Sequence, residues 1–129
     1  MYSIVAGIDS DTERAEAIGK TVAEMPLRKA RVVLVHVFEE NREGAGVRQV
    51  GSISHVENIL EEQDALEVTS VGKSGDPATA VLQAADDHDA NLVCVAGRKR
   101  TPTGKAIFGS VTQEVILDSN YPVLVCDTQ

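Results

Sequence analysis

Residues 97–110, GRKRTPTGKAIFGS, are the stretch of this chain best suited to binding an anion. They include three glycines, four basic residues, three hydroxyl side chains and no acid, although the protein carries a net charge of −8. A glycine lets the backbone approach a ligand closely, and a helix N-terminus offers unpaired N–H groups with a partial positive charge. Phosphate commonly fills such sites. We therefore interpret the stretch as a phosphate-binding loop. The alternative is an ordinary strand-to-helix loop whose basic side chains are solvated.

The flanking residues predict a strand before this loop and a helix after it. Residues 91–96, NLVCVA, form a short apolar run typical of a buried strand. In the segment 111–118 the apolar residues at 111, 115 and 116 follow helical spacing. A strand, a glycine-bearing loop and a helix in this order are the arrangement that an anion site at a helix N-terminus requires.

This segment resembles the universal stress proteins, specifically the small single-domain kind that binds nucleotides. In those members a glycine ends the fourth strand and a second glycine follows after two residues. After a further gap of nine residues, a Gly-Ser or Gly-Thr pair opens the last helix. Gly97 matches the first glycine, and Gly109 with Ser110 matches the pair. Two features depart from the pattern: Arg100 stands at the second glycine position, and the gap to Gly109 is eight residues.

These departures lead to two hypotheses about the loop. An arginine does not readily take a positive φ, so the loop must run differently or Arg100 itself binds phosphate. Gly104 would then supply the missing backbone flexibility at a shifted place. The resemblance extends from residue 2 to residue 127 and is weakest in the middle of the chain.

The resemblance also implies a set of nucleotide-binding residues. Asp9 matches the position beside the nucleotide, although its carboxylate could instead cap the first helix. Val37 matches the position that contacts adenine through its backbone. Gly97 would allow close approach to the ribose or phosphate. The phosphates would be bound by N–H groups at the start of the last helix and by basic side chains of the loop: Gly109, Ser110, Val111, Thr112, Arg98, Lys99, Arg100 and Lys105.

Composition bounds the class of protein. The 129 residues suffice for a single domain, 1–129, with a real core. Aromatic residues make up 3%, which argues against stacking on single-stranded nucleic acid, and a pI near 4.8 argues against a general nucleic-acid surface. We see no signal peptide or membrane span, and Cys94 and Cys126 lie in apolar runs typical of reduced, buried thiols. We therefore expect no nucleic-acid or membrane partner and a cytoplasmic location.

Strand and helix patterns alternate along the whole chain. The expected strands are 4–8, 31–38, 67–71, 91–96 and 122–126, and the expected helices are 13–25, 54–66, 78–87 and 111–118. Residues 9–12 supply caps for the first helix, Ser54 and Glu57 have capping-box spacing for the second, and Asp76-Pro77 opens the third. We expect the polar segment 39–51 to be a mobile loop.

This alternation predicts an α/β fold with an open parallel five-stranded sheet and helices on both faces. The strand order does not follow from spacing. The resemblance implies the Rossmann-like order 3-2-1-4-5, in which Asp9 and Gly97 stand side by side where the order reverses, the usual ligand position in such sheets. The last strand would be an apolar edge without a protecting charge, so we expect a homodimer that pairs through it.

Three other chemistries fit less well. A Walker A loop needs four residues between its glycines, whereas six separate Gly97 from Gly104. Ser110 has no histidine nearby in sequence; we expect His36 to be packed in a strand and His55 and His88 to be solvated on helices. Residues 86–89, DDHD, form an acidic helix end that could hold at most a weakly bound divalent ion.

The sequence thus favours a stress-related regulatory protein that binds ATP or a related adenine nucleotide, with Mg²⁺ as a candidate companion ion. No general base stands beside a bound γ-phosphate, so we expect at most slow ATP hydrolysis. The alternative is a nucleotide-free dimerisation and signalling module whose basic loop binds an anion or an acidic partner. An enzyme of the related adenine-nucleotide α-hydrolase superfamily would need a second substrate site, which this short chain does not display.

Overall fold

The computed structural model describes residues 1–38, 50–100 and 102–127. We predicted a mobile loop over residues 39–51. Residues 39–49 lie outside the described residues, so the mobility of this segment stays a prediction. The elements in chain order are β1 (Tyr2–Gly7), α1 (Thr12–Glu24), β2 (Ala30–Phe38), α2 (Gly51–Glu61), β3 (Leu66–Ser74), α3 (Pro77–Asp87), β4 (Leu92–Arg100), β5 (Ala106–Phe108), α4 (Ser110–Asp118) and β6 (Val123–Asp127).

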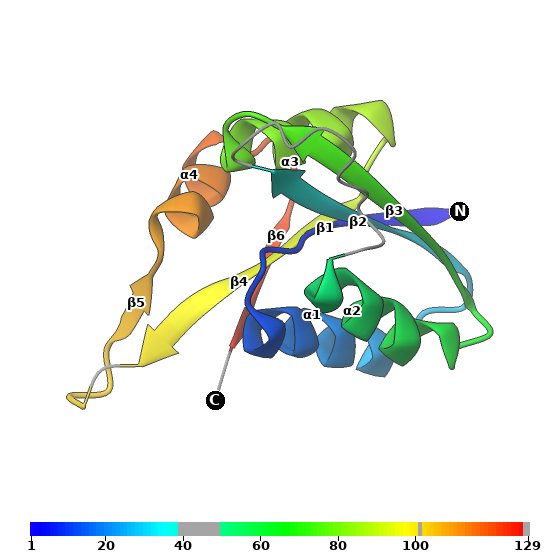
Figure 1. The fold of residues 1–129 in the computed structure, drawn as a ribbon, viewed down its shortest axis with the longest axis horizontal. Helices are drawn as coiled ribbons and strands as arrows, with labels where there is room; N and C mark the ends of the chain where they lie inside the picture. Colours follow the sequence, from blue (N-terminus) through cyan, green and yellow to red (C-terminus); the bar gives the residue numbers. More distant parts are fainter. Residues whose placement is uncertain (39–49, 101, 128–129) are drawn as a thin grey trace.

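The strands form one sheet whose parallel part confirms the predicted fold class (Figure 1). Its parallel strands lie in the order β3-β2-β1-β4-β6. Counted without β5, this is the expected order 3-2-1-4-5, with its reversal between β1 and β4. The sequence did not predict β5, which pairs antiparallel with the far end of β4.

Helices cover both faces of the sheet, as predicted (Figure 1). On one face, α1 and α2 bury Ile18 and Ile53 against Ile4 of β1. On the other, Val81 of α3 and Val115 of α4 pack against the neighbouring Val5 of β1 and against other strand residues. Because successive strand residues point to opposite faces, strands buried on both faces have continuous apolar sequences. This explains why the apolar runs located the central strands well.

The second helix begins earlier than predicted and has no capping box. It starts at Gly51, and the expected cap Ser54 lies inside it, donating its backbone N–H to Val50 O at 3.2 Å. Glu57 accepts a hydrogen bond from Ser70 Oγ of β3 at 2.9 Å. The helix start is therefore determined by packing of its buried face rather than by a side-chain cap.

The first and third helices have the side-chain caps that the sequence predicts at their N-termini. Asp11 caps α1 by accepting the Arg14 N–H at 2.9 Å, so the alternative role of Asp9 as this cap is wrong. Asp76 caps α3 and accepts hydrogen bonds from the N–H and the hydroxyl of Thr79. These bonds hold the pKa of the Asp76 carboxyl below its usual value because they stabilise its charged form.

Both cysteines are buried free thiols, as predicted. Cys94 and Cys126 lie on the neighbouring strands β4 and β6. The hydrogen bond with Cys126 and burial together raise the pKa of the Cys94 thiol, so this sulfur is protonated and unreactive. None of the helices within the described ranges is both long enough and apolar enough to traverse a bilayer.

Candidate functional site

A cleft of about 1040 Å³ opens where the sheet order reverses. Its walls come from the carboxyl ends of β1, β2 and β4, from the first turns of α1, α3 and α4, and from β5. Ligands in open α/β sheets bind at this place because the connections from β1 and β4 leave toward opposite faces and open a crevice between them. The fold therefore places a cleft where the strand order reverses.

Most of the predicted site residues line this cleft. They come from three walls: Asp9 after β1, Val37 at the end of β2, and Gly97, Gly109, Ser110, Val111 and Thr112 at the junction of β4 with α4. Arg98 and Arg100 continue β4 beyond Gly97, and their side chains lie outside the described part of the structure. Their binding roles stay predictions.

The predicted loop 97–110 is a β-hairpin over much of its length. Arg98 pairs with Phe108 and Arg100 with Ala106 across the antiparallel β4 and β5. The turn contains Gly104 at φ 85°, a conformation that favours glycine. That Gly104 replaces the missing second glycine of the family pattern stays a prediction. Arg100 lies in regular strand, which shows how the chain accommodates an arginine at that position.

Gly97 sits at the bend that separates the parallel sheet from this hairpin. Its φ is 113°, a conformation that residues with a Cβ rarely adopt, and the register of β4 against β6 shifts between Ala96 and Arg98. A Cβ on Gly97 would also stand 3.1 Å from Thr112 Oγ1. Glycine is therefore required here by both backbone conformation and space.

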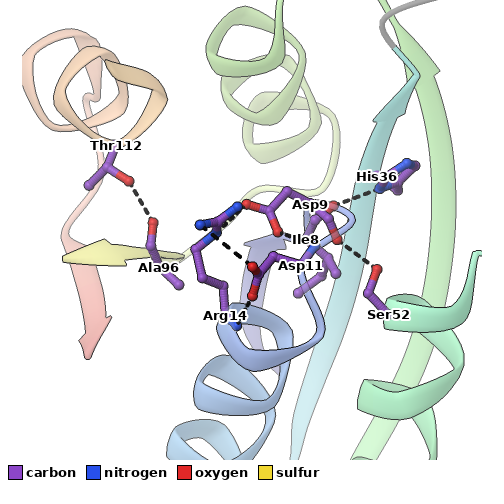
Figure 2. A network of polar contacts seen from close by, with 8 residues as sticks. All are labelled: Ile8, Asp9, Asp11, Arg14, His36, Ser52, Ala96 and Thr112. Atoms are coloured by element: carbon purple, nitrogen blue, oxygen red, sulfur yellow. Dashed lines mark hydrogen bonds and ion pairs between the residues drawn. The ribbon is translucent and has the colours of Figure 1, made fainter. Parts of the chain in front are cut away.

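Two hydrogen bonds attach the start of α4 to the end of β4. Thr112, whose residue is 3% exposed, donates its hydroxyl to Ala96 O at 2.6 Å (Figure 2). The Gly109 N–H donates to Gly97 O at 3.2 Å. The expectation that the Gly109 N–H is available to phosphate is therefore wrong in this structure, because Gly97 O already accepts it.

The first turn of α4 still offers N–H groups to an anion. Ser110, Val111 and Thr112 are the first three helical residues, and such N–H groups lack an acceptor within the helix. Gly109 at the N-cap supplies no side-chain hydrogen bond. The helix start therefore carries partial positive charge toward the cleft, as an anion site requires.

The opposite wall is organised around the Ile8–Asp9 backbone (Figure 2). His36 Nδ1 lies 2.8 Å from Ile8 O, and Ser52 Oγ donates to Asp9 O at 2.6 Å. The Asp9 carboxylate accepts the Asp11 N–H at 2.9 Å through one oxygen and Arg14 Nε–H at 2.6 Å through the other. The turn after β1 is thereby held through both its carbonyls and its carboxylate.

The prediction of a packed His36 is confirmed, and the structure also assigns its proton. The residue is buried, and a carbonyl oxygen can only accept, so Nδ1 carries the hydrogen toward Ile8. In the neutral ring this leaves Nε2 as an acceptor. The ring of Phe38 meets His36 edge-on at a centroid distance of 4.8 Å, and both side chains line the cleft.

The acidic helix end at residues 86–89 does not form a metal site. Asp86 accepts a hydrogen bond from the Tyr121 hydroxyl, and Asp87 Oδ2 lies 3.5 Å from Lys73 Nζ. Across the described ranges, no three His, Cys, Asp or Glu side chains are grouped so that they could hold a metal ion. The weak divalent site considered from the sequence is therefore not supported.

Sequence reasoning missed Arg14, Ser52 and the cleft-lining residues of β5. Arg14 lies in the first turn of α1, five residues after Asp9, and this spacing could have suggested an ion pair across the turn. Ser52 lay between the predicted loop, which ended at residue 51, and the helix predicted from Ser54, whereas the structure places it in the first turn of α2. Its contact with Asp9 depends on how α2 packs beside α1, for which the sequence holds no local signal.

The chain is similar to known proteins along nearly its whole length. Residues 1–127 match the model of the universal stress protein family. The chain belongs to this family. It is 26% identical over 122 residues to a universal stress protein of Mycolicibacterium smegmatis, covering 94% of each chain. It is 29% identical over 124 residues to one of Thermus aquaticus, covering 88% of each.

Solved structures show the same fold. A universal stress protein from Archaeoglobus fulgidus is 30% identical, with a TM-score of 0.75 and 98% of both chains covered. The universal stress protein from the same organism solved in complex with dAMP is 24% identical, with a TM-score of 0.74 and 98% of both chains covered. An Arabidopsis thaliana family member with AMP bound is 14% identical, with a TM-score of 0.73, and the match covers 100% of this chain and 93% of that one.

The geometry around Gly97 leads to a prediction about stability. Gly97→Ala should lower the free energy of unfolding by about 1–3 kcal/mol because alanine resists a positive φ and its Cβ presses on Thr112 Oγ1. Gly109→Ala is the matched control, since Gly109 has φ −66° and no atom within 4 Å of its would-be Cβ. Urea denaturation should show a change below about 1 kcal/mol for Gly109→Ala. Equal losses in the two variants would contradict this description of the bend.

Proposed function

We propose that the protein binds an adenine nucleotide in the cleft between β1 and β4 and acts as a regulatory binding protein in the cytoplasm, where such nucleotides are abundant. AMP is the smallest nucleotide that the proposal includes, and ATP with Mg²⁺ bound to its phosphates is the largest. One observation carries the proposal. The first turn of α4 has no side-chain cap and lines a cleft at the point where the strand order reverses.

The phosphates would lie against the first turn of α4. The N–H groups of Ser110 and Val111 and the Ser110 hydroxyl are the donors, and Gly97 lets the ligand approach the backbone. The Thr112 hydroxyl is bonded to Ala96 O and so positions the helix rather than the ligand. Arg98 and Arg100 would add charge from the hairpin.

The base would lie at the end of β2. Val37 and Phe38 line the cleft, whose lining also includes the buried Val35, Val81 and Val95, so the cleft has apolar side chains against which a planar ring could pack. Backbone groups of Val37 would supply the polar contacts that orient adenine. A predominantly apolar slot with a few placed polar groups is the usual form of a small-ligand site.

Two family members of the same fold support this assignment, because they were solved with dAMP and with AMP. Hydrolysis is not part of the proposal beyond a slow rate. Each oxygen of the Asp9 carboxylate already accepts a hydrogen bond, one from the Asp11 N–H and one from Arg14 Nε–H, so neither is directed at an attacking water. A nucleotide-free module that binds simple anions or an acidic partner is the alternative that the binding experiment distinguishes.

We also propose a homodimer through β6. Within the described residues β6 pairs with β4 alone, so its other edge is open. The Val93 N–H donates to Pro122 O, and backbone groups alternate in direction along a strand, so those of Val123 and Val125 point to the open edge. A second β6 related by a two-fold axis would satisfy them.

The helix beside this edge supports the same partner. α4 contacts β6, and its Leu117 is 80% exposed, with Ile116 partly exposed beside it. Large exposed apolar side chains next to an open sheet edge are typical of an interface with another chain. The dimer would cover both the backbone groups and this apolar surface.

The nucleotide proposal predicts a thermal shift. AMP at about 100 times its Kd should stabilise the protein by about 2.7 kcal/mol and raise Tm by several degrees. Gly109→Val should abolish the shift because the new side chain projects into the cleft, while open space at Gly109 preserves the fold. Gly51→Val makes the same change at the start of α2, also in open space but outside the cleft lining, and should keep the shift. No shift with AMP, ATP or ATP with Mg²⁺ would favour the nucleotide-free alternative.

The dimer proposal predicts the effect of removing one edge donor. Val125→Pro removes an N–H that faces the open edge and leaves the bonds to β4 in place, so it should shift the protein to monomer at micromolar concentration. Val125→Thr keeps the N–H and the branched shape and should stay dimeric. Sedimentation velocity measures both. A monomeric unmodified protein, or a dimeric Val125→Pro variant, would show that β6 is not the interface.

A further inference from the structure

The cleft holds a positive charge at a place that neither the family pattern nor the basic loop indicated. Among the described residues that line it, Arg14 has the one permanently charged basic side chain. Arg14 belongs to the first turn of α1, on the wall opposite α4. Arg14 is one of the residues that line the cleft, and its side chain is 33% exposed.

The side chain of Arg14 crosses toward the end of β4 (Figure 2). Its Cδ lies 4.0 Å from the point where a Cβ on Gly97 would stand, and Thr112 Oγ1 lies 3.1 Å from that same point. Arg14 and the first turn of α4 thus approach the same small region from opposite sides. An anion bound at the start of α4 would therefore lie within reach of the guanidinium.

Contacts with the turn after β1 hold this side chain in place. Arg14 Nε donates to Asp9 Oδ2 at 2.6 Å. Nη1 also forms an ion pair with Asp11 Oδ2 at 3.8 Å, which is too long for a hydrogen bond. The bond to Asp9 uses one of the five donors of the guanidinium. A guanidinium held through Nε keeps its two terminal nitrogens for a second, planar acceptor such as a phosphate.

The charge on Asp9 needs this partner if a nucleotide binds. A carboxylate beside a phosphate is repulsive, and the ion pair with Arg14 offsets that repulsion. Hydrogen bonds from His36 and Ser52 hold the Ile8 and Asp9 carbonyls in place. The backbone that carries the Asp9 carboxylate, and through it Arg14, therefore has a fixed position. A preorganised contact of this kind loses little conformational entropy on binding.

We propose that Arg14 binds the phosphate adjoining the ribose of the nucleotide, and that Asp9 is a positioning residue that holds Arg14 rather than a direct ligand contact. This inference rests on the proposed function and deepens it. It makes the site selective for phosphorylated adenosine over adenosine itself, through a residue outside the glycine-rich segment.

The test compares AMP with adenosine by isothermal titration calorimetry. Arg14→Gln should weaken AMP binding about tenfold to hundredfold, the value of a hydrogen bond between charged groups, and change adenosine binding less than about twofold. Lys20→Gln is the matched control, because Lys20 lies in the same helix, forms an ion pair with Glu16 at 2.7 Å, and loses the same charge. It should bind both ligands as the unmodified protein does.

A double-mutant cycle tests the role of Asp9. Asp9→Asn should weaken AMP binding when Arg14 is present, because Asp9 acts through Arg14. In the Arg14→Gln background it should cause no loss and should restore part of the affinity, because it removes a carboxylate that would otherwise repel the phosphate. An equal loss in both backgrounds would overturn the positioning role. Arg14→Lys keeps the charge but not the planar guanidinium, so its affinity for AMP should lie between those of the unmodified protein and of Arg14→Gln.

The outcomes separate this inference from the proposed function. If the unmodified protein binds AMP and Arg14→Gln binds it equally well, or loses AMP and adenosine to the same extent, the role of Arg14 is overturned while nucleotide binding stands. If Arg14→Gln does not fold, the Arg14→Lys variant provides the test. If Arg14→Lys binds AMP as tightly as the unmodified protein, the proposed role of the planar guanidinium is overturned. If the unmodified protein binds neither ligand, both proposals fail.

Discussion

The hydrogen bond from the buried Thr112 hydroxyl to Ala96 O is the contact on which the candidate site depends most. It ties the first turn of α4 to the end of β4 at 2.6 Å. Together with the bond from the Gly109 N–H to Gly97 O, it positions the N–H groups of that turn relative to the sheet reversal. It requires the backbone to bend away immediately after Ala96, and Gly97 with φ 113° makes that bend. One close contact therefore explains a glycine, a buried threonine and the direction of a helix.

The other wall of the cleft is built by a different means. Here side chains from two other elements hold the backbone: His36 of β2 at Ile8 O and Ser52 of α2 at Asp9 O. The two walls are joined by the sheet, because β1 and β4 are neighbours. A site whose walls stand on adjacent central strands keeps its geometry, since both strands are buried in the core.

Much of the fold could be predicted from local pattern, and the failures have physical causes. The central strands were predictable because burial on both faces makes them continuously apolar, as in residues 32–35. The start of α2 was not, since the packing of Ile53 and Val56 outweighs the capping signal of Ser54. The hairpin of β4 and β5 was missed because the segment's glycines and basic residues indicated a binding loop, and β5 has only three residues.

The candidate site likewise contains residues that could be predicted from local sequence and residues that could not. Gly97, Gly109 and Ser110 could be placed from sequence, because their spacing relative to one strand and one helix is local. Arg14 could not, because its approach to Gly97 depends on how α1 is oriented across β4. The use of the Gly109 N–H by Gly97 O likewise depends on the exact angle between helix and strand, which no local pattern encodes.

The central claim is that an adenine nucleotide binds between the end of β1 and the start of α4. The most direct measurement is a titration of ¹⁵N-labelled protein with AMP, followed by amide chemical shifts. The account predicts saturable shifts for Val37, Gly97, Ser110 and Val111, with β3 and the far ends of the helices unaffected. Absence of saturable shifts, or shifts confined to residues remote from the cleft, would contradict it.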